Sequence, residues 1–193
     1  WRDDKSNPEF TPDDTMFQSW KTVAAQEGLI VKTGRWNIKG NPRVMLVDFT
    51  PYFGQQNEIF AKFWETYKLD SISGQWDYIE PALFGYASGK IIESFTTFFH
   101  EHHNIIAQFH EWMTGTGILY LEHKAPWIAT AFTTHATVLG RCIAGNNRPL
   151  YGNMKDFNPG QVAREFNVIA KQSLEKFSAI EADVFTTVSD ITS

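Results

Sequence analysis

Residues 105–115 read IIAQFHEWMTG, an apolar run that ends in a histidine, a glutamate and a tryptophan. The run predicts a strand over residues 104–109, and the segment that follows, residues 110–124, predicts a helix. The same order returns at once, with a strand predicted over residues 126–134 and a helix over residues 135–145. Strands that alternate with helices in this way are typical of an α/β fold with a parallel sheet. The continuously apolar strands also predict a sheet that helices cover on both faces.

The remaining segments add helices, strands and two irregular stretches to this plan. Apolar residues at helical spacing predict a long helix over residues 77–103, with Pro81 in its first turn. The other predicted elements are strands over residues 28–38, 42–50 and 182–189, helices over residues 17–26, 57–67 and 162–180, and loops over residues 3–14 and 144–160. A loop as long as residues 144–160 suits a lid or a contact arm.

The composition excludes several classes of function. The 193 residues fit one domain, and the net charge of −5 comes without a basic cluster, so nucleic acid is not an expected partner. No apolar run reaches about 18 residues, the length that crosses a membrane, so we expect no membrane partner. Cys142 is the only cysteine, which rules out an intrachain disulfide and favours the cytoplasm. Because the chain begins without methionine and stops directly after a predicted strand, we expect it to be a piece of a longer protein.

Polar side chains follow two of the predicted strands at the point where each strand ends. His110, Glu111 and Trp112 follow the first, and Thr134 and His135 close the second. Ligands of an open parallel sheet bind beyond the carboxyl ends of its strands, where helix N-termini also point their amides. This edge therefore suits a polar ligand such as a nucleotide sugar. Alternatives stay open for each residue, because a lone histidine is often structural, Thr134 could cap a helix and Trp112 could belong to the core.

Metal and nucleophile chemistry find less support in the sequence. Residues 100–103 read HEHH, but a zinc-protease helix needs His-Glu-x-x-His, and Asn104 and Thr114 stand where the second histidine would be required. We therefore predict no metal site. Cys142 lies in an amphipathic segment and suits a packed small side chain better than a nucleophile. The predicted helix that contains Gly115 and Gly117 has no phosphate-binding pattern, so we expect these glycines to allow close packing.

Five segments together resemble the glycogen synthase family of the animal and fungal type. They are TGRWNIKGNPRVMLVDF (33–49), FGYASGKIIESF (84–95), IIAQFHEWMTG (105–115), FTTHATVLGR (132–141) and ADVFTTVSDIT (182–192), in the family's order. The resemblance implies a retaining glycosyltransferase built from two Rossmann-like domains, the GT-B architecture. Residues 1–193 would then form a single partial domain, the N-terminal Rossmann-like domain truncated at both ends, with the C-terminal domain absent.

The resemblance also implies roles for single residues. His110 would be the catalytic residue that bonds the donor glucose in the interdomain cleft, and Glu111 and Trp112 would shape its turn. Thr134 and His135 would line a second wall of that cleft, and Arg141, also substrate-binding, would lie one helical face along. Glu80 stands where the family usually has an aspartate near the acceptor sugar, and Gln108 stands where many members have a histidine. The implied substrates are UDP-glucose or ADP-glucose and an α-1,4-glucan, with no metal or other cofactor.

Further expectations concern partners and rival functions. The remainder of the parent protein would be an obligatory partner, a homo-oligomer is possible, and this chain alone should be inactive. Two alternatives remain open at this point. The chain could be a non-catalytic glucan-binding or assembly module with the same fold, or an unrelated α/β hydrolase or metal enzyme that uses the histidines.

Overall fold

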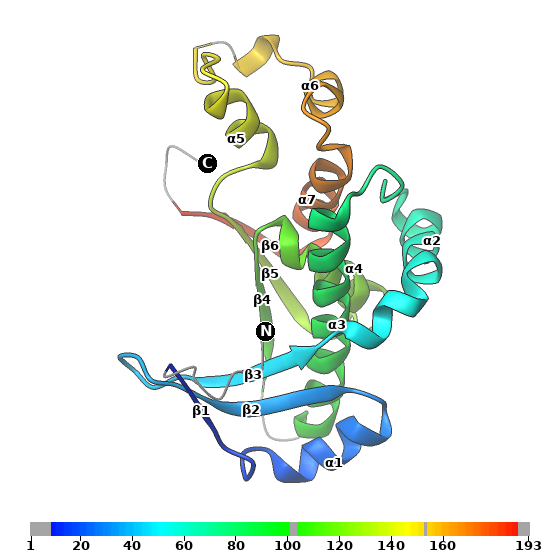
Figure 1. Ribbon diagram of the computed structural model, residues 1–193, viewed down its shortest axis with the longest axis vertical. Coiled ribbons are helices and arrows are strands. Elements are labelled where there is room, and N and C mark those ends of the chain that lie inside the picture. The colour runs from blue at the N-terminus through cyan, green and yellow to red at the C-terminus, as the bar shows by residue number, and fades with distance from the viewer. Residues whose placement is uncertain (1–8, 101–103, 153, 189–193) are drawn as a thin grey trace.

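The computed structural model describes residues 9–100, 104–152 and 154–188 (Figure 1). The last residues of the predicted 77–103 helix, the start of the predicted 3–14 loop and the end of the predicted 182–189 strand lie outside these ranges. The elements are β1 (Phe10–Pro12), α1 (Gln18–Gln26), β2 (Ile30–Trp36), β3 (Arg43–Asp48), η1 (Thr50–Gln55), α2 (Gln56–Tyr67), α3 (Trp76–Phe99), β4 (Ile106–His110), η2 (Trp112–Thr114), α4 (Gly115–Lys124), β5 (Ala129–Thr134), α5 (Val138–Gly145), η3 (Met154–Asp156), α6 (Pro159–Glu165), α7 (Ile169–Glu181) and β6 (Val184–Thr187).

A parallel sheet in the order β4-β5-β6 confirms the predicted α/β fold. Phe109 of β4 pairs with Phe132 of β5, which pairs in turn with Phe185 of β6. Helices α3, α4 and α7 lie together on one side of this sheet (Figure 1). The carboxyl ends of β4 and β5 therefore reach the same edge, since Thr133 lies opposite His110 in the register.

The prediction that both faces of the sheet are covered was wrong for the described chain. Burial alternates along β4: Ala107 and Phe109 are buried against α4, whereas Ile106, the first residue of the strand, is 70% exposed. Val184 and Phe185 of β6 are also about half exposed. The apolar side chains of β4 and β6 suggested two covered faces. A continuous apolar run, however, does not show whether one or both faces of the sheet are covered by helices of the same chain.

A second, antiparallel sheet in the order β1-β2-β3 contains the two strands predicted near the start of the chain. Strand β1 was not predicted, because residues 3–14 carry two prolines and read as a loop. Phe10 pairs with Trp36 in the ladder, and their rings meet edge to face at 5.8 Å. This tertiary contact, rather than local propensity, makes residues 10–12 a short edge strand, where a proline at the end is tolerated.

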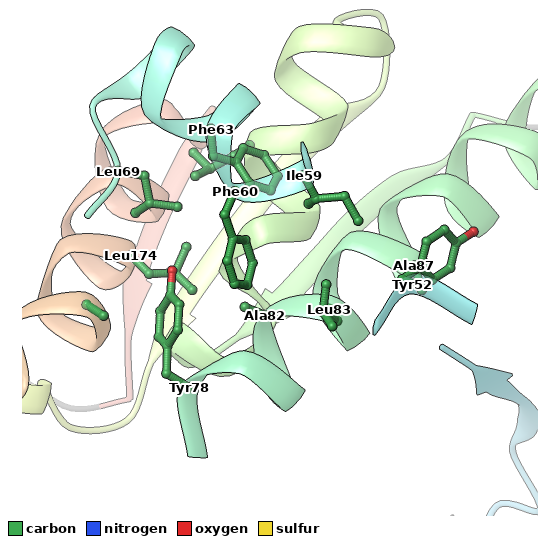
Figure 2. Close-up of a cluster of buried hydrophobic side chains, with 12 residues drawn as sticks. Tyr52, Ile59, Phe60, Phe63, Leu69, Tyr78, Ala82, Leu83, Ala87 and Leu174 are labelled. Atoms are coloured by element: carbon green, nitrogen blue, oxygen red, sulfur yellow. The ribbon is translucent and has the colours of Figure 1, made fainter. Parts of the chain in front are cut away.

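Helix α3 runs past both sheets and carries much of the core (Figure 1). The helix begins at Trp76, so Pro81 lies in its interior and not, as predicted, in its first turn; the proline removes one hydrogen-bond donor there. Figure 2 shows Tyr78, Ala82 and Leu83 of α3 facing Phe60 and other side chains of α2 and α7. This cluster fixes α7 beside α3 and α4, and α7 in turn lies next to the sheet edge.

Close packing at Gly115 and Gly117 is confirmed. A Cβ on Gly115 would collide with the Ser178 hydroxyl, and a Cβ on Gly117 would lie 2.8 Å from the Gly85 carbonyl oxygen and closer still to the Phe109 ring. Glycine at these positions therefore lets α4 approach the backbone of α3, the Phe109 ring of β4 and the Ser178 and Leu174 side chains of α7.

Replacing Gly117 with alanine should destabilise the chain. The added methyl group meets a backbone oxygen and a buried ring, so we expect the free energy of unfolding to fall by about 1–3 kcal/mol. Urea unfolding measures this change. Gly145→Ala is the matched control, because nothing lies within 4 Å of a Cβ at that last residue of α5. Equal stability of the two variants would contradict the packing role of Gly117.

Candidate functional site

Two histidines meet at the carboxyl edge of the parallel sheet. His110 is the last residue of β4, and His135 directly follows β5. Nδ1 of His110 lies 3.1 Å from Nε2 of His135, and both side chains are exposed. Because a neutral imidazole carries one N–H and one acceptor nitrogen, one ring donates to the other and each keeps a second nitrogen for a ligand. The prediction that these two residues lie at one edge of the sheet is confirmed. Their functional role stays a prediction.

Glu111 makes the turn that places this pair. Its backbone has φ 64° and ψ 162°, a conformation that L residues rarely adopt and that costs on the order of 1–3 kcal/mol. Two contacts hold the turn, since the Glu111 N–H donates to the Thr133 carbonyl at 3.0 Å and the Glu111 carboxylate accepts the His135 N–H at 2.9 Å. Strained backbone conformations of this kind cluster at functional sites. Here the strained residue, Glu111, turns the chain from β4 into η2.

Arg141 completes the group that we call the candidate site: His110, Glu111, His135 and Arg141. Its guanidinium nitrogen Nη2 lies 3.8 Å from the Glu111 carboxylate, while the arginine side chain is 64% exposed. The candidate site therefore offers two exposed imidazoles and one exposed cation on a single edge. Such groups can donate to sugar hydroxyls and attract phosphate.

The first turn of α5 is capped differently from the prediction. Thr137, and not Thr134, is the N-cap, because its hydroxyl accepts the Gly140 N–H at 3.0 Å. The helix therefore begins at Val138, three residues later than predicted. The intervening residues form the exposed stretch that carries His135 across the sheet edge.

Glu175 of α7 is a buried acid that the sequence analysis missed. Both carboxylate oxygens accept the Val138 N–H, at 3.1 and 3.0 Å, and the residue is 9% exposed. Burial raises the pKa of Glu175 to about 7, although the Val138 hydrogen bond opposes the shift. The only sequence signal was its position next to Leu174 on the buried side of an amphipathic helix, which is not distinctive.

Trp112 belongs to the packing beneath the site. Its ring stacks on Tyr78 of α3, with centroids 6.1 Å apart and an interplanar angle of 5°. The Lys171 ammonium lies 5.5 Å from the centroid of the Trp112 ring and also pairs with Asp77. Trp112 therefore packs against the core, which agrees with the structural alternative. Its substrate-binding role stays a prediction.

Thr134 directly precedes His135 but is buried, and Glu80 lies on another element, α3. Thr134 is 2% exposed, and its hydroxyl has no hydrogen-bond partner within the described ranges. It lines a cavity of about 500 Å³ between α5, the following segment and α6. Glu80 is an exposed residue of α3, and no hydrogen bond or ion pair of the described chain joins it to the histidines.

A polar row beside His110 links the three parallel strands and also escaped prediction. Gln108 donates to the Thr133 hydroxyl at 3.0 Å, and Thr133 exchanges a 2.7 Å hydrogen bond with Thr186. The row fixes β4, β5 and β6 against one another directly beneath the edge that carries the candidate site. Gln108 thus has a structural partner of its own.

The other candidates that the sequence suggested give no second site within the described residues. There, no group of three or more His, Cys, Asp or Glu side chains is arranged to hold a metal ion, and His102 and His103 lie outside the described ranges. Cys142 is half-buried, and burial raises the pKa of its thiol, which opposes thiolate chemistry. None of the described helices is both long and apolar enough to cross a membrane.

Known proteins similar to this chain share one description. The family model for glycogen synthase matches residues 6–193. The chain is 31% identical over 185 residues to the glycogen [starch] synthase of Neurospora crassa, covering 95% of this chain and 26% of that relative. It is 34% identical over 167 residues to the liver glycogen [starch] synthase of Rattus norvegicus, covering 86% and 24%. It is 32% identical over 160 residues to glycogen [starch] synthase isoform 2 of Saccharomyces cerevisiae, covering 82% of this chain and 23% of that relative. The chain thus spans about a quarter of the length of these curated relatives.

Proposed function

The chain belongs to the glycogen synthase family, and from this membership we infer the function of the longer protein that we call the parent. We propose that the parent transfers glucose from UDP-glucose or ADP-glucose to the non-reducing end of an α-1,4-glucan, with retention at the anomeric carbon. The present chain would supply the N-terminal Rossmann-like domain of a GT-B enzyme working in the cytoplasm. The observation that carries this proposal is the exposed His110–His135 pair at the carboxyl edge of the parallel sheet.

The geometry of the candidate site suits the sugar end of the donor. Each imidazole of the pair keeps one nitrogen for a hydroxyl group, and in our proposal His110 bonds the donor glucose. Glu111 serves this contact indirectly, because its carboxylate fixes the backbone of His135. Hydrogen bonds that are already aimed before the reaction cost no reorganisation when charge develops on the sugar.

Arg141 would contribute charge at the same edge. Its exposed guanidinium lies beside Glu111 and could approach the diphosphate of the donor. One cation does not balance a departing nucleoside diphosphate, so the proposal assigns most of that stabilisation to the C-terminal part of the parent. The candidate site is then one wall of an interdomain cleft, and Glu80 and Thr134 remain proposed acceptor-side and wall residues.

The isolated chain should therefore be inactive, whereas the parent should be active. Incorporation of labelled glucose into glycogen, measured with each nucleotide sugar in turn, tests both statements. We expect transfer by the parent and no transfer above background by the 193-residue chain. Transfer by the chain alone would show that one wall suffices, and a parent that binds glycogen without transfer would favour the non-catalytic module.

A further inference from the structure

Glu175 makes an unusual contact for a buried acid. The residue is 9% exposed, and both carboxylate oxygens accept one backbone N–H, that of Val138. Among the described residues no lysine or arginine forms an ion pair with it. Burying a carboxylate without a paired cation costs free energy. The hydrogen bond from the Val138 N–H offsets part of this cost.

That partner connects Glu175 to the candidate site. Val138 is the first residue of α5, the helix that carries Arg141, and it follows His135 by three positions. Two acids on different elements hold this short segment. Glu111, in the turn after β4, accepts the His135 N–H, and Glu175, on α7, accepts the Val138 N–H. The segment between β5 and α5 is thus fixed at two amides, one by each carboxylate.

We propose that Glu175 is a positioning residue: its carboxylate holds the first turn of α5, and with it His135 and Arg141, and protonation of this carboxylate loosens that hold. A charge-assisted hydrogen bond is roughly twice as strong as a neutral one, so the protonated acid retains the contact in weaker form. The structural part of this inference stands on the described contacts alone. Only its effect on turnover rests on the proposed function.

The charges around Glu175 place its titration in the neutral range. Burial raises the pKa to about 7 from a usual 4.5, the Val138 hydrogen bond and the Arg141 charge lower it, and the Glu111 charge raises it. Other charged groups on the neighbouring helices are engaged or exposed: Lys171 on α7 pairs with Asp77, Glu165 on α6 pairs with Arg148, and Arg164 on α6 is exposed. The contact should therefore change strength close to neutral pH.

The amide of Val138 reports the contact directly. In the wild-type chain we expect its proton chemical shift to titrate with a midpoint near pH 7, which is the pKa of Glu175. Glu175→Gln should abolish this titration, whereas Glu65→Gln, the same change at an exposed site on α2, should leave it unchanged. A Val138 amide that does not titrate, or that still titrates in Glu175→Gln, would overturn the inference.

The same proton has a predictable effect on stability. Because the folded pKa of about 7 lies above 4.5, the folded chain binds the proton more tightly than the unfolded chain. This contribution is fully present below about pH 4.5 and is lost as the pH rises through about 7. The urea midpoint of the wild type should therefore fall further across this window than that of Glu175→Gln. Equal falls in the two chains would contradict a titrating Glu175.

Turnover of the parent separates positioning from simple stability. We expect wild-type kcat to rise several-fold as the pH passes through 7, and kcat of Glu175→Gln to be low and without this rise, with KM for the glucan little changed. A Glu175→Gln parent that keeps the wild-type pH profile would overturn the positioning role. If the parent transfers no glucose, the proposed function fails, and the Val138 titration still decides whether Glu175 holds α5.

Discussion

His110→Ala in the parent should lower glucosyl transfer on the order of 100-fold, as loss of a preorganised donor does in other enzymes. The side chain is exposed at the end of β4, so its removal leaves the core intact, and the change in unfolding free energy should stay within about 0.5 kcal/mol. Loss of kcat with an unchanged fold would assign His110 to the reaction. Initial rates with labelled donor and a thermal melt of each protein provide the two readouts.

His123→Ala is the matched control for that experiment. His123 is also an exposed histidine, but it lies in the last turn of α4, away from the candidate site. Its replacement should leave transfer at the wild-type level. Near wild-type activity of His110→Ala, or equal losses in both variants, would remove His110 from the proposed role.

Leu174→Ala should be among the most destabilising single changes in the chain. Leu174 is fully buried in the core cluster of Figure 2, where it joins α7 to α2 and α3. Truncation of a buried leucine removes apolar contacts and leaves a cavity, which costs about 2–5 kcal/mol. Chemical unfolding of the 193-residue chain, followed by circular dichroism, measures this loss.

Ile180→Ala provides the comparison on the same helix. Ile180 is 59% exposed, so the same kind of truncation should change stability by no more than about 0.5 kcal/mol. If Leu174→Ala and Ile180→Ala unfold at the same urea concentration, then α7 does not depend on this core. The position of Glu175, one residue along from Leu174, would then lack its support.

The class of the fold could be predicted because its signal is local. Apolar runs followed at once by helical periodicity mark β4, β5 and the helices after them, and the parallel sheet follows from that order. What could not be predicted depends on contacts between distant segments. Strand β1 exists because Phe10 meets Trp36, and the exposed face of β4 reflects which elements the described chain contains.

Helix boundaries show the same limit. Residues 162–180 have one continuous helical pattern, yet the structure divides them into α6 and α7. The break lies at Asn167, whose φ of 54° ends the first helix, and asparagine tolerates that conformation better than most residues. Nothing in the apolar spacing marks this point, because Val162 and Ala163 before the break and Ala170 and Leu174 after it are all buried.

The candidate site was predictable in part for a geometric reason. The carboxyl ends of neighbouring parallel strands must meet, so His110 and His135 could be paired from the order of the strands alone. Glu175 could not, since its partner is a backbone amide thirty-seven positions away in the sequence. The alternative that Thr134 caps a helix is wrong for α5, because the hydroxyl that caps α5 belongs to Thr137.

A structure of the parent with a bound nucleotide sugar would reveal whether His110 contacts the donor glucose. We predict a ring nitrogen of His110 within about 2.7–3.2 Å of a glucose oxygen, with His135 beside it and Arg141 on the phosphate side. A donor whose glucose touches neither His110 nor His135 would contradict the account.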